Sequence, residues 1–369
     1  MTVYLIAEVI VFLLAYPLCI YKPNNIKKIL YVVLVFGYLF GLSYFRYGIG
    51  NDYFSYINIF YRAFVTDWQD CFNDEVEGGY MVLVKLISLI TSDTKIMHGI
   101  MAMLCLAPTG YIIAKYSKNV WLSCHLYLCL TFYYSSMNFI RQTLTATIIF
   151  LAYRLFIQRK TIPFIIVVLI ASTLHATVLL LIPVYFMIAY IKPTTKALGV
   201  GMVTLIALYL TSNTILNFIA QKIPKYAGYI GTKYFQVGLS QIYLVVPILY
   251  MLLMLYAYHE TDYHKEEYSS MFVNTSVFTF GIWFFITKHF ILERFSIYVY
   301  IFVMLALPHV TEYLRGYYIE KDTSETAKVG RIKYIVLMIL VVGVTLWYNL
   351  FGMISGFHGV FPYETWLNG

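Results

Sequence analysis

The chain has 369 residues, of which 61% are apolar and only 12% are charged, and its formal net charge is +8. Soluble globular domains carry about 25% charged residues, so a chain of this composition cannot hide its apolar surface from water in its own interior. Its long, unbroken apolar runs exclude an outer-membrane barrel and predict an all-α polytopic membrane protein. The positive charge does not indicate a nucleic acid as partner, because Lys and Arg stand at the ends of the apolar runs, where they set topology.

Apolar runs suited to membrane spans occur along the whole chain, which is predicted to be a single transmembrane domain, residues 1–369. They predict a bundle of about 11–13 transmembrane helices. Residues 80–91 form a shorter run that contains Lys85, so a half-helix or an interfacial helix is expected there. In chain order the longer runs cover residues 2–20, 29–45, 96–114, 119–136, 140–157, 162–174, 176–191, 196–212, 241–258, 270–287, 291–313 and 333–353.

Clusters of Lys and Arg predict which helix ends are cytoplasmic. Lys22 lies in the first such cluster, and the later clusters agree with it only if residues 80–91 do not cross. Two long connections, residues 46–79 and 213–240, are then expected outside the cell membrane. Most of the unusual polar residues collect on the same side, which predicts one shared cavity that faces the periplasm or the cell exterior.

The stretch FRYGIGNDYFSY follows the second apolar run and combines Arg46 and Asp52 with two glycines and several tyrosines. An arginine offers a planar pair of donors to a phosphate or a carboxylate, and Gly48 and Gly50 permit a ligand to approach the backbone closely. A juxtamembrane anchor followed by an ordinary turn would have the same composition. The stretch is therefore a candidate anion site, with an anchor as the alternative.

A second arginine, Arg141, stands at the start of another apolar run, close to Asn138 and Gln142. The spacings of three and four residues are expected to place these side chains on one helical face. A polar stripe on a membrane helix usually lines a cavity, because polar groups are costly in lipid. An arginine near a helix end can instead extend its charged head to the membrane interface.

His175 interrupts an apolar stretch that would fill one very long helix, so two shorter helices are expected to meet near it. Ionisable residues within a membrane mark functional sites, although a lone histidine is also often a packing residue. Arg294 follows Glu293, for which a local ion pair is expected, and would be a third arginine on the outer side. Three converging arginines suit a dianionic or larger phosphate group, because such a cluster is strongly unfavourable without an anion. The spacing of His and Cys does not indicate a metal site.

The chain resembles the EpsG/Wzy-type polysaccharide polymerase family in segments that follow one another over most of its length: FRYGIGNDYFSY, EGGY, FIRQTLTATI, LIASTLHATVLLLIPVYF, ERFSIY and FPYE. The resemblance implies a GT-C-like glycosyltransferase, a multi-pass protein of the bacterial inner (cytoplasmic) membrane with its active site toward the periplasm. Such an enzyme polymerises oligosaccharide repeat units carried on undecaprenyl pyrophosphate. It transfers the growing chain onto a new lipid-linked unit, for O-antigen, capsule or exopolysaccharide.

The resemblance and the residue chemistry together imply catalytic and substrate-binding roles for individual residues. The arginines would bind the donor pyrophosphate and stabilise the departing oxygen, while Asp52, or else Glu77 or His175, would take the proton of the acceptor hydroxyl. No cofactor and no metal is expected, with a metal at Asp52 and Glu77 as the less favoured alternative. The expected partners are the undecaprenyl-pyrophosphate-linked oligosaccharide, the lipid bilayer and a chain-length regulator. The candidate substrate-binding residues are Arg46, Tyr53, Tyr56, Asn138, Arg141, Gln142 and Arg294.

Three rival functions remain beside the polymerase. A glycan ligase would use the same donor and nearly the same chemistry. A flippase or other transporter of lipid-linked oligosaccharide should carry charges near the bilayer midplane and show repeated halves, whereas here the charges gather at one face and no repeat is visible. A membrane acyltransferase would need a histidine-centred acid–base pair, and His175 has no acidic neighbour in the sequence.

Overall fold

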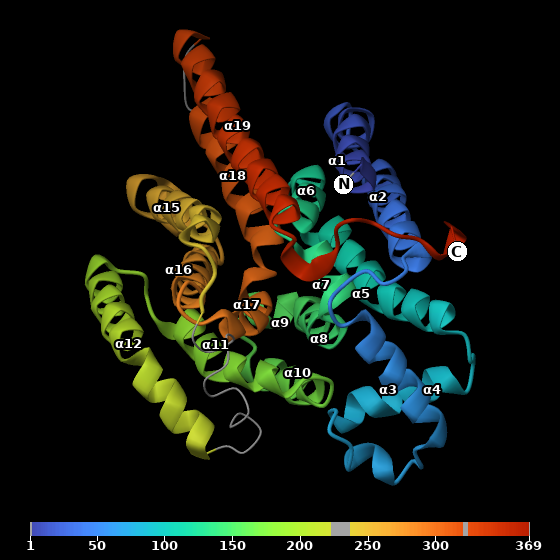
Figure 1. Cartoon of the computed structure of the whole chain (residues 1–369). Coiled ribbons are helices and arrows are strands. Elements are labelled where there is room, and N and C mark those ends of the chain that lie inside the picture. Colours follow the sequence, from blue (N-terminus) through green and yellow to red (C-terminus); the bar gives the residue numbers. More distant parts are fainter. Residues whose placement is uncertain (1, 223–236, 320–323, 369) are drawn as a thin grey trace. The chain divides into compact units, whose positions relative to one another are not determined.

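The structure, a computed structural model, describes residues 2–222, 237–319 and 324–368 (Figure 1). These ranges contain helices and turns but no β-strand, and their one strand-like pairing is an isolated antiparallel bridge between Arg46 and Thr365. The all-α fold class predicted from the apolar runs is confirmed. Much of the predicted outer connection 213–240 lies outside the described residues, and its first part belongs to helix α12 (Thr195–Lys222).

Contacts between Cα atoms divide the chain into two compact units, each of which is described by itself. Unit 1 comprises Met1–Phe156, Lys160–Leu179 and Ile301–Gly369, and unit 2 comprises Ile157–Arg159 and Leu180–Tyr300. The prediction of a single transmembrane domain stays a prediction.

Unit 1 holds most of the helices and nearly all of the predicted site residues. Its elements are α1 (Thr2–Ala15), the π-helical turn η1 (Tyr16–Ile20), α2 (Asn25–Phe45), α3 (Tyr53–Val65), η2 (Asp70–Phe72), α4 (Gly78–Ser88), α5 (Thr94–Tyr116), α6 (Val120–Cys129), α7 (Phe132–Asn138), α8 (Ile140–Leu151), α10 (Thr161–Ser172), α18 (Val303–Ile319), α19 (Ser324–Ile354), η7 (Phe357–Gly359) and η8 (Trp366–Asn368).

Unit 2 is built around α16, which contacts α11, α15 and α17. Its elements are α11 (Leu181–Tyr190), α12, η4 (Gln241–Leu244), α15 (Val245–Glu260), η5 (Asp262–Lys265), α16 (Ser269–Ile286), η6 (Phe290–Leu292) and α17 (Glu293–Tyr300). Two further elements, α9 (Tyr153–Ile157) and η3 (Ala176–Leu180), lie where the chain passes from one unit to the other.

The protein is a multi-pass membrane protein. In the described ranges, 7 helices are long and apolar enough to cross a bilayer, or 8 if Phe290–Tyr300 and Val303–Ile319 together form one span. The sequence-based number of about 11–13 spans also counts apolar runs that the structure divides into shorter helices. These shorter helices are Gly78–Ser88, Val120–Cys129, Ile140–Leu151, Thr161–Ser172 and Ala176–Tyr190.

Two local predictions, a short helix at residues 80–91 and a break at His175, are confirmed. Residues 80–91 were expected to form a short helix, and α4 has 11 residues, which gives it a length of about 16 Å against the ~30 Å of a hydrocarbon core. A break was expected at His175, and α10 ends at Ser172 while η3 begins at Ala176.

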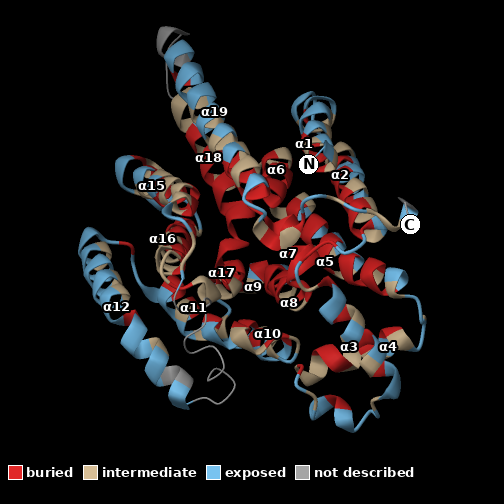
Figure 2. Ribbon diagram, viewed as in Figure 1, coloured by how far each residue is buried: buried red, intermediate tan, exposed pale blue. Residues whose placement is uncertain are grey.

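The centre of unit 1 is formed by α6, α7 and α8, where residues 122–140 are all buried (Figure 2). A helix that is apolar on all sides is stable only when other elements surround it. The side chain of Asn119 begins α6 by accepting a hydrogen bond of 3.2 Å from the N–H of Leu122. Thr131 adopts a left-handed φ of 67° between α6 and α7, so the apolar run 119–136 becomes two helices instead of one.

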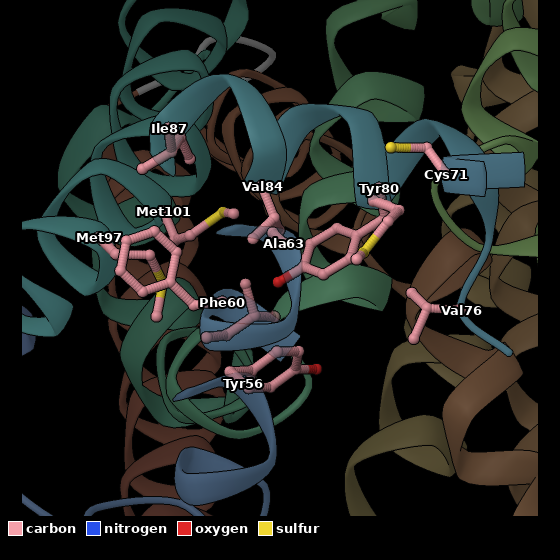
Figure 3. Packing of buried hydrophobic residues seen from close by; sticks show 12 residues of the cluster. Tyr56, Phe60, Ala63, Cys71, Val76, Tyr80, Val84, Ile87, Met97 and Met101 are labelled. Carbon is pink, nitrogen blue, oxygen red and sulfur yellow. The ribbon is translucent and has the colours of Figure 1, made fainter. Parts of the chain in front are cut away.

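The segment predicted as an outer loop, residues 46–79, contains a helix of its own and packs on α4. Phe60 and Ala63 of α3 and Val84 of α4 are buried in one hydrophobic cluster (Figure 3). Burial of a side chain such as Phe60 contributes about 1.5–3 kcal/mol. The cluster fixes the two helices whose first turns follow Asp52 and Glu77, the N-cap residues of α3 and α4.

Candidate active site

Four predicted site residues meet around one carboxylate. Arg141 Nη1 lies 2.5 Å from Glu77 Oε2, and His175 Nδ1 lies 3.3 Å from Glu77 Oε1. Gln142 Nε2 donates a hydrogen bond of 3.1 Å to His175 Nε2. These four residues, called the Glu77 cluster below, connect the start of α4 with α8 and with the break after α10.

The glycine pair in the segment EGGY allows Glu77 to reach this position. A Cβ atom on Gly79 would overlap with Thr173, so only a glycine lets α4 begin this close to the end of α10. The N–H of Tyr80 consequently donates to the carbonyl of Thr173 at 3.3 Å. The N–H of Ala176 donates to Glu77 Oε1, also at 3.3 Å. The backbone N–H of Ala176 thus holds the Glu77 carboxylate in addition to Arg141 and His175.

The charge state of Glu77 follows from its neighbours. Burial by itself would raise the pKa of Glu77, but the interaction with His175 and the positive charge of Arg141 outweigh burial and hold the pKa below its usual range. Glu77 is therefore ionised at neutral pH and is a weak general base. Its ion pair adds stability above the ordinary carboxyl pKa, and this contribution disappears only when the pH falls through the lowered native pKa.

His175 gains an acidic partner that its sequence neighbours do not provide. The sequence-based argument against a membrane acyltransferase was the lack of such a partner, and this argument is wrong, because Glu77 lies 3.3 Å from His175. In the structure the same carboxylate also pairs with Arg141. The cluster is thus an arginine site with a histidine at its edge and not an isolated acid–base pair.

Two buried tyrosines position Arg141. The hydroxyl of Tyr56 accepts a hydrogen bond of 3.4 Å from the backbone N–H of Arg141, and the guanidinium carbon lies 5.8 Å from the ring centroid of Tyr80. Both rings belong to the hydrophobic cluster between α3 and α4 (Figure 3). Tyr80 was not selected from the sequence, and Tyr56 was selected for a sugar contact, which stays a prediction.

Arg46 occupies a second site, about which three facts matter. Its side chain is buried, with 3% of the residue surface exposed. Nη1 donates a hydrogen bond of 2.6 Å to the carbonyl of Met137. The guanidinium carbon lies 5.6 Å from the ring centroid of Tyr53. Tyr53 in turn stacks on His98 with ring centroids 4.4 Å apart. Tyr53 was predicted to contact the substrate, and the structure shows its ring supporting Arg46 and His98.

No counter-ion for Arg46 is found in the described part of the chain. None of the ion pairs there includes it, and its Nε atom has no hydrogen-bond partner. Burial lowers the pKa of Arg46 from its ordinary value, but a guanidinium remains charged in proteins. A buried cation without a counter-ion is strongly unfavourable, so this position suits an anionic ligand.

The C-terminal tail, residues 355–368, covers the loop that follows Arg46. The N–H of Gly50 donates to the carbonyl of Gly359 at 3.0 Å. The side chain of Asn138 joins both segments, because Oδ1 accepts from the N–H of Asp52 at 3.3 Å and Nδ2 lies 3.5 Å from His358 Nδ1. His358 was missed by the sequence analysis, and its only signal was its position close to the segment FPYE.

The expectation that Asn138, Arg141 and Gln142 share the face of one helix is wrong. Asn138 ends α7, and the next residue, Phe139, has φ −101° and ψ 60°, which is outside the helical region. The break directs Asn138 to the loop at Asp52, whereas Arg141 and Gln142 reach the Glu77 cluster. The residues before and after this break therefore supply side chains to two different sites.

Helix α3 connects the two sites within unit 1. Asp52 precedes the helix, Tyr53 supports Arg46, and Tyr56 binds the backbone of Arg141.

Arg294 lies in α17 of unit 2, so the predicted convergence of three arginines stays a prediction. The nine predicted residues that lie together in unit 1 are Arg46, Asp52, Tyr53, Tyr56, Glu77, Asn138, Arg141, Gln142 and His175.

Gly50→Ala is expected to destabilise the loop far more than Gly48→Ala. Gly50 has φ +97°, and a Cβ atom there would lie 2.5 Å from the carbonyl oxygen of Met137. Gly48 has φ +65°, and the nearest atom to a Cβ would be in Phe54, 3.9 Å away. Gly48→Ala should therefore cost about 1 kcal/mol for the left-handed backbone alone, and Gly50→Ala about 3 kcal/mol. Melting temperatures of the two purified variants check this, and equal losses would contradict it.

His358→Gln is expected to make the protein less sensitive to acid. Burial lowers the pKa of His358 from 6.5 to about 3, so the unfolded chain binds a proton between these pH values and the folded chain does not. Stability therefore falls as the pH drops from 6.5 toward 3, by about 2 kcal/mol between pH ~6.5 and ~5. The glutamine keeps a polar group beside Asn138 but cannot titrate.

The measurement is the change in melting temperature between pH ~7 and ~5 for the wild type and for His358→Gln. The exposed residue His264 provides a control in the substitution His264→Gln, which should melt as the wild type does at each pH. The same pH dependence in wild type and His358→Gln would show that His358 does not titrate in this way.

A comparison with known families adds independent information about these residues. The EpsG family model matches residues 28–365, a range that includes both sites and the tail up to Thr365. No curated protein and no solved structure matches the chain, so a likeness to GT-C enzymes stays a prediction.

Proposed function

The chain belongs to the EpsG family, and on this premise we propose that it is a polysaccharide polymerase of the bacterial inner membrane. The donor is a growing glycan on undecaprenyl pyrophosphate, and the acceptor is a new lipid-linked repeat unit. The reaction takes place at the periplasmic face, in a GT-C-like arrangement of helices. A chain-length regulator is the protein partner in this proposal.

The observation that carries the proposal is the state of Arg46. A buried guanidinium that has no carboxylate partner among the described residues favours an anion. A second arginine, Arg141, is connected to it through the first turn of α3, where the Tyr56 hydroxyl accepts a hydrogen bond from the backbone N–H of Arg141. A diphosphate is the group on a lipid-linked sugar that two guanidinium groups recognise best, because each offers paired, charge-assisted hydrogen bonds.

The proposed chemistry is a glycosyl transfer in one displacement or two. The acceptor hydroxyl attacks the anomeric carbon of the donor, the bond from that carbon to the pyrophosphate oxygen breaks, and undecaprenyl pyrophosphate leaves. Arg46 and Arg141 stabilise the negative charge that develops on the departing oxygen, which is often the largest catalytic contribution. The hydroxyl proton passes to a carboxylate.

Asp52 is the proposed general base. It is half-buried, it lies at the junction of the loop and α3, and the N–H of its own backbone is fixed by Asn138. Glu77 is less suited, because Arg141 and His175 lower its pKa and so weaken it as a base. In this assignment Glu77 orients Arg141, and Gln142 orients His175.

Reconstitution with a defined donor tests the function. The purified protein in liposomes receives a synthetic undecaprenyl-pyrophosphate-linked repeat unit, and the products are separated by size. A polymerase yields a ladder of lipid-linked oligomers. A ligase would yield glycan only on an added non-lipid acceptor, and a flippase would move the intact substrate across the bilayer without new glycosidic bonds; either result would contradict the proposal.

A further inference from the structure

Two helices of unit 1 bring a carboxylate, an imidazole and a thiol together at a place that the spacing of His and Cys did not indicate. Glu8 belongs to α1, and His125 and Cys129 lie one turn apart on α6. Their exposed fractions are 4%, 0% and 0%. The proposed glycosyl transfer uses none of these side chains, so their polarity within an apolar bundle needs another explanation.

The ligand atoms of the three side chains lie within 4.8 Å of one another, close enough to surround one ion. Glu8 Oε2 lies 3.0 Å from His125 Nδ1, Cys129 Sγ lies 3.0 Å from Glu8 Oε1, and Cys129 Sγ lies 3.6 Å from His125 Nδ1. Metal–ligand bonds of about 2.0–2.3 Å place the ligand atoms of a tetrahedral zinc ion about 3.3–3.7 Å apart. Small side-chain adjustments are enough to accommodate the ion.

The hydrogen bonds of Thr345 show which nitrogen of His125 is available. The Thr345 hydroxyl donates its single proton to the carbonyl of Val341 at 2.7 Å, so it accepts the hydrogen bond of 2.8 Å that joins it to His125 Nε2. Nε2 therefore carries the hydrogen, and in a neutral ring the lone pair of Nδ1 points at the Glu8 carboxylate. Two acceptors at that distance repel each other unless a proton or a metal ion lies between them.

A fourth polar side chain, Asn349, lies beside the same group. Its residue surface is 0% exposed, and its amide interacts with the Cys129 thiol and with the Tyr134 hydroxyl. The oxygen of a buried amide beside the thiol is a suitable ligand for a cation.

We propose that Glu8, His125, Cys129 and Asn349 hold a structural zinc ion that joins α1, α6 and α19. Nitrogen, oxygen and thiolate ligands together suit zinc, and four protein ligands leave no open position for a substrate. One ionised carboxylate and one thiolate neutralise Zn²⁺, so the complex is neutral in the low-dielectric interior of the bundle. The Cys129 proton is released to water when the ion binds.

The proposed ion has a consequence for the candidate active site. Helix α19, which carries Thr345 and Asn349, leads directly into the C-terminal tail, and the tail binds the loop at Gly50. A link between α19 and α6 would fix the start of the tail against the core of unit 1. The ion would thereby hold Arg46 in place without contact to the substrate.

The first test uses the wild-type protein, purified in detergent with a tag that contains no histidine. Elemental analysis should find about one zinc per chain, and removal of the ion with a strong chelator should lower the melting temperature, with recovery after addition of Zn²⁺. Cobalt added to the stripped protein should give the visible bands of a tetrahedral site and the charge-transfer band of a thiolate ligand.

Variants identify the ligands. Cys129→Ser and His125→Ala should reduce bound zinc at least about tenfold, and Cys129→Ser should remove the charge-transfer band. Thr345→Val should retain the tetrahedral spectrum but bind zinc about 10–100-fold more weakly, because Thr345 only orients His125. The matched control is Cys124→Ser, since Cys124 is a buried cysteine of the same helix that lies outside the group, and it should bind zinc as the wild type does.

The proposal would be overturned if the wild-type protein contained no zinc, kept its melting temperature in chelator and gave no cobalt bands. Such a result would show that protons alone hold the group together. Equal zinc content in the wild type and in Cys129→Ser would overturn it as well. Because the wild-type measurements need no substitution, the test remains decisive even if a variant fails to fold. The test does not measure polymerase activity, so failure of the zinc proposal and failure of the proposed function can be distinguished.

Discussion

Arg141→Ala is expected to abolish long polymer while the protein still reaches the membrane. The guanidinium of Arg141 lies at the rim of the Glu77 cluster, with 25% of its side chain exposed, where it can contact both the carboxylate and a ligand. Loss of one donor to a developing oxyanion reduces catalysis about 10²–10³-fold. The measurement is the size distribution of lipid-linked glycan made by the reconstituted variant.

A loss of activity in Arg141→Ala has two possible causes, and a double variant separates them. Removal of the arginine alone takes the guanidinium from Glu77 and leaves it His175 and the N–H of Ala176, so the variant is also expected to lose stability. In the double variant Arg141→Ala/Glu77→Gln both charges are absent, so the melting temperature should recover while polymer remains absent. If the double variant makes full-length polymer, Arg141 has no part in catalysis.

The substitution of another arginine provides a matched control. Arg62 of α3 forms an ion pair of 2.8 Å with Asp74, and 41% of its side chain is exposed. It lies in the same unit and its loss changes the net charge equally, but it belongs to neither site. Arg62→Ala should therefore make polymer of normal length, since exposed ion pairs contribute only ~0–1 kcal/mol.

Arg46→Gln is expected to have a similarly large effect on activity for a different reason. The glutamine amide can still donate to the carbonyl of Met137, which the guanidinium contacts at 2.6 Å, so the fold should be retained. The buried positive charge is lost, and with it the proposed partner of the diphosphate. Polymer synthesis should fall at least about 100-fold, and the melting temperature should not decrease, because no uncompensated cation remains.

Binding of inorganic pyrophosphate provides a readout that does not depend on turnover. Pyrophosphate should raise the melting temperature of the wild type by ligand-linked stabilisation and leave that of Arg46→Gln unchanged. The control is Lys95→Ala, which removes an exposed cation over the ring of Trp366 and should respond as the wild type does. An equal response of wild type and Arg46→Gln would show that Arg46 does not bind the anion.

The sequence by itself determined the properties that depend only on residues close to one another along the chain. The share of apolar residues required a membrane as solvent, and the apolar runs located the long helices, because hydropathy and helix length are local properties. The short helix at residues 80–91 and the break at His175 were found from length and polarity, whereas the selection of FRYGIGNDYFSY as an anion site stays a prediction. The resemblance to the family rested on the order of short segments and is confirmed by the match over residues 28–365.

Only the tertiary structure decided which distant side chains meet. The pairing of Glu77 with Arg141, the approach of His358 to Asn138, and the group of Glu8 and His125 all join residues from separate helices. Such contacts result from the way in which whole helices pack, and no local pattern encodes them. The backbone conformation decided two further points. The left-handed turn at Thr131 divided an apolar run that hydropathy shows as continuous. The non-helical conformation of Phe139 separated Asn138 from Arg141, so that their side chains reach different sites.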